Sequence, residues 1–180
     1  MKVSEIFIDG PLVIQPNVYK DERGYFLETY NEAEYVKHDI IAEFLQDNQS
    51  KSMKGALRGL HFQAPPFAQG KMVRVIKGAV LDVIVDIRVA SPTYGQHYTI
   101  ELTEDNFTIF WIPEGFAHGF ATLEDDTIFV YKCTDVYDKQ SEGGILWNDP
   151  DLNIDWGIKN PVLSEKDKQN TLFKDLVSPF

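Results

Sequence analysis

The residues with the clearest capacity for chemistry lie in one short segment. His61 stands within Leu57-Arg58-Gly59-Leu60-His61-Phe62-Gln63, and Lys71 follows soon after it. Histidine titrates near neutral pH, so it can take a proton and return it, while a lysine or arginine can hold an oxyanion as it forms. A lone histidine in a strand is more often structural, but the nearby Arg58 and Lys71 favour proton-transfer chemistry here.

A second segment, Pro113-Glu114-Gly115-Phe116-Ala117-His118-Gly119-Phe120, carries the Pro-x-Gly-x-x-His pattern of the second half of cupin barrels. The histidine of that pattern is usually a metal ligand. A metal cupin also needs a His-x-His pair and a glutamate to complete the ligand set. The four histidines here, at positions 38, 61, 97 and 118, contain no such pair. We therefore expect no metal, and His118 either donates hydrogen bonds or braces a turn.

For three further residues the sequence allows both a structural and a functional role. Tyr131 and Tyr137 are either core and rim aromatics or a proton donor and a stacking surface for a ring. Asp167 follows Ser164 by three positions, as in a capping box, so it either caps a helix or orients a histidine by accepting its second ring N–H. The spacing in the sequence does not decide between the structural and the functional role.

Composition narrows the class of protein. A chain of 180 residues is expected to form a single domain over residues 1–180, and its net charge of −11 argues against general nucleic-acid binding. The longest apolar stretch, from Val80 to Ile87, is interrupted by Asp82 and Asp86, so we expect neither a membrane span nor secretion. Cys133 is the only cysteine, which fits a reducing compartment and predicts a cytoplasmic protein.

The elements that must position these residues are mostly strands. Segments rich in β-branched and aromatic residues, separated by turn signals, predict strands at Met72–Ile76, Val80–Ile87, His97–Leu102, Phe107–Ile112 and Thr127–Thr134. Such spacing indicates an antiparallel barrel or a double-sheet jelly roll. We expect short helices at Glu32–Lys37 and at Ser164–Leu176, the second with Ser164 as its N-cap.

Alternation along these strands assigns faces. It places Lys71 with Val73 and Val75 on one side, and Tyr131 with Phe129 and Cys133 on one side. Around His61 it places Arg58, Leu60 and Phe62 on the opposite side. We expect Arg88 to be an ordinary surface residue. Large apolar and charged residues that point into one small barrel favour a ligand-holding interior.

Taken together, the segments resemble one family closely: the dTDP-4-dehydrorhamnose 3,5-epimerases. The resemblance covers nearly the whole chain. Its landmarks are Asp21-x-Arg23-Gly24-x-Phe26-x-Glu28, Gln46-x-Asn48-x-Ser50, the His61 segment, Gln69-Gly70-Lys71-x-Val73-Arg74-Val75, Asp82-x-x-x-Asp86-x-Arg88, the His118 segment, Tyr131, Tyr137, Trp147-x-Asp149-Pro150 and Leu163-Ser164-x-Lys166-Asp167. It implies a mostly β fold, a cupin-type jelly-roll β-barrel with a few short helices and a barrel core at about residues 45–135.

The resemblance also implies roles. His61 looks like the base, Asp167 its orienting carboxylate, Tyr131 the acid on the other face of the sugar, and Lys71 the group that holds the C4 oxygen. Tyr137 looks like the residue that stacks on thymine. The other positions that resemble substrate contacts are Arg23, Phe26, Glu28, Gln46, Asn48, Arg58, His118, Glu142 and Lys166. Family members are homodimers, so Arg23 and Phe26 are expected to act in the neighbouring subunit's site.

The implied reaction is epimerisation at C3 and C5 of dTDP-4-dehydro-6-deoxy-D-glucose to dTDP-4-dehydro-L-rhamnose, in dTDP-L-rhamnose biosynthesis. It needs no cofactor, because a proton leaves and returns through an enolate with no redox step. The nearest alternative is an epimerase that inverts only C3 or only C5 of a related dTDP-4-keto-deoxysugar. A metal cupin oxygenase or isomerase, and an inactive sugar-nucleotide binder, are alternatives from other classes.

Overall fold

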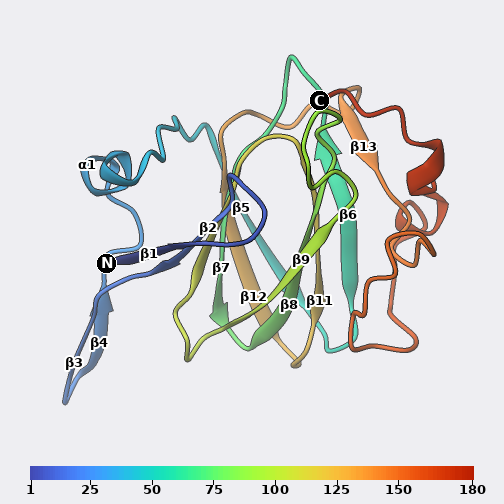
Figure 1. The fold of residues 1–180 in the computed structure, drawn as a ribbon. Helices are drawn as coiled ribbons and strands as arrows, with labels where there is room; N and C mark the ends of the chain where they lie inside the picture. The colour runs from blue at the N-terminus through green and yellow to red at the C-terminus, as the bar shows by residue number, and fades with distance from the viewer.

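The computed structural model describes all residues from Met1 to Phe180, and its main elements are strands of two facing antiparallel sheets (Figure 1). The six-stranded sheet has the order β1 (Lys2–Glu5), β2 (Leu12–Gln15), β10 (Ile109–Ile112), β7 (Lys71–Lys77), β12 (Thr127–Cys133) and β5 (Gln46–Ser52). The five-stranded sheet has the order β13 (Glu142–Gly144), β6 (Leu57–Gln63), β11 (Phe116–Thr122), β8 (Ala79–Asp86) and β9 (His97–Thr103). The predicted mostly β jelly roll is confirmed.

Helical structure is short. The predicted first helix is present as α1 (Glu32–Tyr35) and a 3-10 turn, η1 (Val36–His38). The helix predicted at Ser164–Leu176 is wrong, because this stretch contains only two 3-10 turns, η2 (Asp167–Gln169) and η3 (Phe173–Asp175). Between them the backbone is extended, and Thr171 forms a β-bridge with Ile145. This pairing with the barrel replaces the helical hydrogen bonds. No helix is long and apolar enough to cross a membrane.

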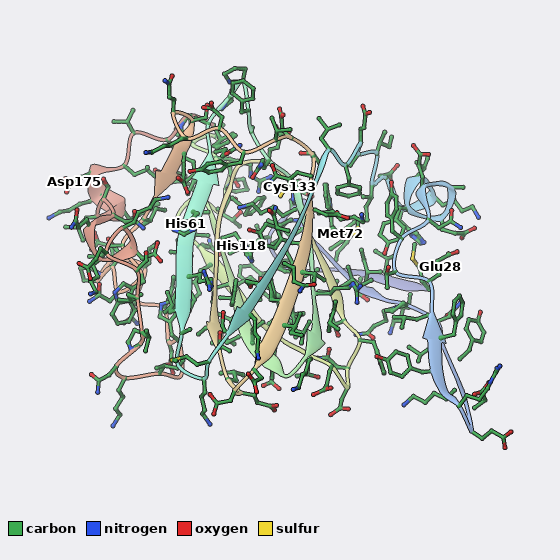
Figure 2. All side chains as sticks on the ribbon, turned by 180° about the vertical axis from the view of Figure 1, so that it is seen from behind. Glu28, His61, Met72, His118, Cys133 and Asp175 are labelled. Carbon is green, nitrogen blue, oxygen red and sulfur yellow. The ribbon has the colours of Figure 1, made fainter.

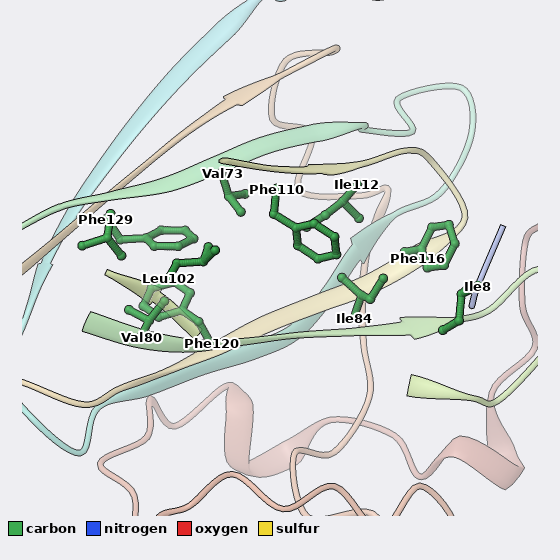
Figure 3. Close-up of a cluster of buried hydrophobic side chains, with 11 residues drawn as sticks. Ile8, Val73, Val80, Ile84, Leu102, Phe110, Ile112, Phe116, Phe120 and Phe129 are labelled. Atoms are coloured by element: carbon green, nitrogen blue, oxygen red, sulfur yellow. The ribbon is translucent and has the colours of Figure 1, made fainter. Parts of the chain in front are cut away.

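The main core lies between the two sheets (Figure 3). One sheet contributes Val73, Val75, Phe110, Ile112 and Phe129, and the other contributes Val80, Ile84, Leu102, Phe116 and Phe120. These side chains alternate along their strands with residues that face outward, as expected for paired sheets. The apolar packing therefore sets the spacing between the two sheets. That spacing also sets the width of the interior beyond the core, where charged side chains face one another.

The outer face of the five-stranded sheet is covered by the C-terminal part of the chain, residues 145–180. Leu60, Val83 and Ala117 of the sheet pack against Leu152 and Trp156, all of them buried. The red segment beside β6 in Figure 1 is the end of this layer. It brings residues of η2 to the edge of the barrel interior next to β6.

Strand β6 contains an extra residue relative to its partner β11. His61 lies opposite His118 and Arg58 lies opposite Phe120, so Gly59 and Leu60 together face the single Gly119. Strict alternation predicted that Arg58 and His61 point to opposite faces. That prediction is wrong, because the bulge resets the alternation and both side chains line the same cavity.

Arg88 is also not an ordinary surface residue. Its guanidinium donates to the fully buried Asp86 from Nε at 2.9 Å and from Nη2 at 2.8 Å. Burial pushes the pKa of Asp86 upward, but hydrogen bonds from Arg88, Ser91 and Thr93 outweigh it and lower the pKa to about 2. This cluster fixes the end of β8 beyond the core.

A substitution at Gly59 tests the bulge. A Cβ there would lie 2.5 Å from the Gly119 Cα, at a φ of +134°. Gly24 has a similar φ of +128° with nothing within 4 Å, so it is a matched control. We expect Gly24→Ala to lower the free energy of unfolding by about 1–2 kcal/mol through backbone strain alone. Gly59→Ala should cost a further ~1–3 kcal/mol through overpacking, as measured by urea unfolding. Equal losses would contradict the close approach of β6 and β11.

Candidate active site

A cavity of about 500 Å³ opens between the two sheets at the end of the apolar core. Arg58 and His61 of β6 and His118 of β11 form one wall, while Lys71 of β7 and Tyr131 of β12 come from the opposite sheet. Figure 2 shows His61 and His118 side by side on their neighbouring strands. The cavity is therefore walled by basic, phenolic and imidazole groups from both sheets.

The His61 ring is held by a carboxylate from the C-terminal layer. Its Nε2 lies 2.5 Å from Oδ1 of Asp167, whose own backbone N–H donates to the Ser164 hydroxyl at 3.1 Å. Asp167 is buried, whereas the His61 side chain is 28% exposed and lines the cavity. The Ser164 contact resembles the predicted cap, but the Asp167 side chain contacts the histidine.

This contact fixes which nitrogen of His61 can act as a base. Burial raises the pKa of Asp167, but the hydrogen bond and charge of His61 lower it more, so the pKa lies below its usual value. An ionised carboxylate only accepts hydrogen bonds, so the Nε2 of His61 must carry the proton. Neutral His61 therefore has its lone pair on Nδ1, the arrangement that a general base requires.

Tyr131 is a weak acid on the opposite wall. Its pKa is raised, mainly by burial and also by the charges of Cys133 and Glu142, while Arg58 acts in the opposite direction. The phenol therefore keeps its proton at neutral pH. A protonated Tyr131 that faces the His61 ring across a cavity provides one proton donor and one possible proton acceptor on opposite sides of any bound molecule.

Lys71 is a partly buried lysine that lines the same cavity as these two groups. Burial lowers the pKa of its ammonium, and the charges of Cys133, Asp82 and Glu142 raise it. Asp82 and Glu142 are themselves paired, with His118 and Lys166. A cation in an interior of low dielectric acts strongly on negative charge that develops beside it.

A second hollow of about 390 Å³ adjoins the first and shares His61, Lys71 and Tyr131 with it. Its other polar walls are Gln46, Asn48, Gln63, Gln69, Tyr137 and Glu142. Tyr137 is half exposed, and its backbone N–H donates to the Gln46 Oε1 at 2.8 Å. Amide groups and an exposed aromatic ring suit a base and a sugar better than a purely apolar ligand.

Glu142 ties the rim of this hollow together. One carboxylate oxygen accepts the Tyr137 hydroxyl hydrogen bond at 2.8 Å, and the other pairs with the Lys166 ammonium. Burial raises the pKa of Glu142, but the Lys166 and Tyr137 hydrogen bonds lower it more. The C-terminal segment that carries Asp167 is thus anchored beside the exposed tyrosine.

Three predicted contact residues lie elsewhere. Arg23, Phe26 and Glu28 belong to or follow the hairpin β3 (Val18–Asp21) and β4 (Gly24–Leu27), which projects away from both sheets (Figure 1). Arg23 pairs with Asp21, and Glu28 accepts a hydrogen bond from Asn31 at 3.2 Å. Within one chain these three residues do not line either hollow.

Two residues, one lining the cavity and one behind its wall, received no role from the sequence. Ser50 lines the cavity, and its buried hydroxyl has no hydrogen-bond partner in the chain. Asp82 lies behind His118 and accepts its Nε2–H at 2.9 Å. The period-two spacing of Gln46, Asn48 and Ser50 on one strand was the available signal for Ser50. Asp82 carried a weaker signal, a charge inside an apolar strand.

The arrangement can move a proton to or from either face of a bound molecule and can stabilise an oxyanion between those faces. No group of three or more His, Cys, Asp or Glu side chains is arranged to hold a metal ion. Proton removal beside a carbonyl is the reaction class that these groups can perform together.

Comparison with known proteins gives the same reaction class. The profile of the family dTDP-4-dehydrorhamnose 3,5-epimerase matches residues 5–175. A Shigella flexneri protein named dTDP-4-dehydrorhamnose 3,5-epimerase is 49% identical over 178 residues, which cover 97% of each chain.

Solved structures agree in fold along nearly the whole chain. The dTDP-4-dehydrorhamnose 3,5-epimerase of Elizabethkingia anophelis superposes with a TM-score of 0.93 at 46% identity, covering 97% of each chain. A dTDP-6-deoxy-D-glucose-3,5-epimerase of Legionella pneumophila in complex with dTDP-4-keto-L-rhamnose gives a TM-score of 0.94 at 45% identity. It covers 97% of this chain and 94% of its own.

The bond between His61 and Asp167 predicts a pH-dependent stability. Because the pKa of Asp167 is lowered in the folded state, its ionised form stabilises the fold above about pH 4, and this contribution is lost as pH falls through the folded-state pKa. We expect Asp167→Asn to cost about 1–3 kcal/mol at pH 7 by urea unfolding, with a smaller difference from the unsubstituted protein below about pH 4. Asp175→Asn, at an exposed carboxylate, is the control. A difference that stays constant across this range would contradict the assigned charge on Asp167.

Proposed function

The chain belongs to the dTDP-4-dehydrorhamnose 3,5-epimerase family, and from that premise we propose that His61 and Tyr131 are its two proton carriers. The protein epimerises dTDP-4-dehydro-6-deoxy-D-glucose at C3 and C5 to dTDP-4-dehydro-L-rhamnose in dTDP-L-rhamnose biosynthesis. The observation that carries the residue assignment is their placement on opposite sheets, with Lys71 in the same cavity.

The chemistry of each inversion follows from the C4 ketone. This carbonyl acidifies the hydrogens at C3 and C5, and His61 Nδ1 removes one of them. The C–H electron pair moves to form a carbon–carbon double bond, and the carbonyl electrons move to the C4 oxygen. The Lys71 ammonium stabilises that oxyanion. The Tyr131 hydroxyl then donates its proton to the opposite face of the same carbon, so the ketone reforms and the centre is inverted.

The proton balance closes within the site. After one inversion His61 carries an additional proton and Tyr131 has lost one. Transfer of a proton from the imidazolium to the phenolate, directly or through water, restores both groups. Asp167 stabilises the intermediate imidazolium and keeps Nδ1 directed at the sugar. The second inversion then repeats the same steps at the other carbon.

We assign the adjoining hollow to the nucleotide. Tyr137 provides an exposed ring on which thymine stacks, and Gln46 and Asn48 provide amide groups beside it. Arg58 and His118 are positioned for oxygens of the ligand, since a guanidinium suits a diphosphate. Glu142 and Lys166 hold the rim through their ion pair.

We further propose a homodimer in which the hairpin completes the neighbouring subunit's site. Phe26 of this hairpin is 69% exposed and Tyr19 is 63% exposed, an unusual amount of free aromatic surface for a projecting element. Arg23, Phe26 and Glu28 would then contact ligand bound to the partner. In this assignment residues 1–180 act as a single epimerase domain in the cytoplasm, where the lone Cys133 stays reduced.

Deuterium exchange separates the two proton carriers. We expect His61→Asn to abolish exchange of the substrate's C3 and C5 hydrogens in D₂O, with turnover reduced at least ~10²-fold, because no base remains. Tyr131→Phe should still exchange these hydrogens while inversion falls by a similar factor, because the proton returns only from the face it left. Proton NMR of the recovered sugar nucleotide measures both exchange and inversion.

Binding of dTDP, measured by calorimetry, is the control for both variants and should change little. Undiminished inversion in Tyr131→Phe, or exchange that persists in His61→Asn, would remove the residue concerned from its assigned role. Label at only one of the two carbons would instead indicate a single-centre epimerase.

Subunit mixing tests the shared site. We expect His61→Asn and Arg23→Ala to be weakly active alone, but co-expression should restore about a quarter of normal activity per site. The reason is that half of the dimers are mixed, and each mixed dimer contains one site with both His61 and Arg23 intact. If Arg23 serves its own subunit, mixed dimers have no intact site. Activity no higher than that of the separate variants would then contradict the proposal that Arg23 acts in the neighbouring subunit's site.

A further inference from the structure

Asp82 is a charged residue inside the apolar interior of the sandwich. It lies on β8 between Val80 and Ile84, and all three are fully buried. Val80 and Ile84 belong to the core between the sheets, so alternation directs the Asp82 side chain into the same interior. Burying a carboxylate in such surroundings is costly unless other groups compensate its charge.

Only one of the two carboxylate oxygens of Asp82 has a hydrogen-bond partner. Oδ2 accepts a hydrogen bond from the Nε2 of His118 at 2.9 Å, in a pair with almost no exposure to solvent. Oδ1 is buried and has no hydrogen-bond partner. An unpartnered buried oxygen of this kind calls for an explanation beyond the packing of one histidine.

A lysine on the opposite sheet faces the same interior as Asp82, without a direct hydrogen bond to it. Lys71 shares its face of β7 with Val73 and Val75, which contact the same core as Val80 and Ile84. His118 and Lys71 line one cavity, with Asp82 directly behind His118. Burial lowers the pKa of Lys71, and the negative charge of Asp82 raises it.

We propose that Asp82 is a positioning residue of the reaction, whose buried carboxylate fixes the His118 ring and keeps Lys71 in its ammonium form. This inference rests on the proposed function of Lys71 as the group that stabilises the C4 oxyanion. A neutral amine could not supply that electrostatic stabilisation. Asp82 thus acts on the substrate only through two other side chains.

His118 is held by two contacts that agree with this role. Its ring stacks on Phe129 at 6.3 Å between centroids, and its Nε2 donates to Asp82. These contacts leave Nδ1 as the nitrogen available to a ligand in the cavity. Without Asp82 the ring would lose its only hydrogen-bond partner in the chain, and its orientation would no longer be set.

Other charges also act on Lys71, so the test must isolate Asp82. The titratable groups that share a hollow with Lys71 or act on its charge come from several elements: Arg58 and His61 of β6, Asp82 of β8, His118 of β11, Tyr131 and Cys133 of β12, Tyr137, Glu142 of β13, and Lys166 and Asp167 of the C-terminal layer. Three of them are carboxylates. Glu142 is engaged by Lys166 and Tyr137, and Asp167 by His61, whereas Asp82 keeps one oxygen without a hydrogen-bond partner.

The test is a carbon-NMR titration of the Lys71 Cε in protein labelled with [13C]lysine, the signal being assigned by its loss in Lys71→Arg. We expect Asp82→Asn to shift the Lys71 titration to lower pH by roughly one unit or more, the effect of one neighbouring charge. The alkaline limb of kcat should move in the same direction, with a smaller change in KM.

Asp86→Asn is the matched control. Asp86 is a fully buried carboxylate on the same strand, but it pairs with Arg88, Ser91 and Thr93 and does not line the cavity. We expect this variant to be destabilised and to leave the Lys71 titration unchanged. Equal shifts in both variants, or no shift in Asp82→Asn, would overturn the proposal.

The same titration of the unsubstituted protein is a second test, and it does not require a variant to fold. We expect its Lys71 to be an ammonium at pH 7, and a neutral Lys71 at that pH would overturn the proposal. The titration also needs no turnover. A protein that lacks epimerase activity but shows the expected shift would therefore contradict the proposed function and not the link between Asp82 and Lys71.

Discussion

The bond between His61 and Asp167 joins two parts of the chain that are 106 positions apart. His61 belongs to a barrel strand, whereas Asp167 belongs to the layer that covers the outer face of the same sheet. The covering layer buries Leu152 and Trp156 against the sheet, so the apolar packing sets where the carboxylate arrives. A charge that decides the tautomer of the base is thus positioned by hydrophobic burial.

The spacing of the two sheets determines what this base can do. The core around Phe110 and Phe129 fixes the distance between the sheets, and the same interior becomes charged where the core ends. His61 then faces Tyr131 across a gap that a sugar ring can occupy. Because inversion needs removal on one face and return on the other, a two-walled interior suits it better than a surface cleft.

The sequence predicted most strand positions correctly, and several of the residues that it singled out line the cavity. Its predictions failed where contacts between distant parts of the chain determine the local structure. Strand positions followed from β-branched and aromatic runs, and the face of Lys71 followed from alternation. Arg58 was placed on the wrong face because a bulge at Gly59 depends on close contact with Gly119 on another strand. The helix at Ser164–Leu176 was wrong because Thr171 pairs with the barrel instead. Asp82 received no role because its partner His118 is on a different strand.

The most direct measurement is a crystal structure with an unreactive analogue of the 4-keto sugar nucleotide bound. We expect the His61 Nδ1 and the Tyr131 hydroxyl to lie on opposite faces of the sugar ring, each about 3–3.5 Å from C3 or C5. We also expect the Lys71 ammonium to lie beside the C4 oxygen. A sugar with both residues on the same face, or with its C4 oxygen turned away from Lys71, would contradict these roles.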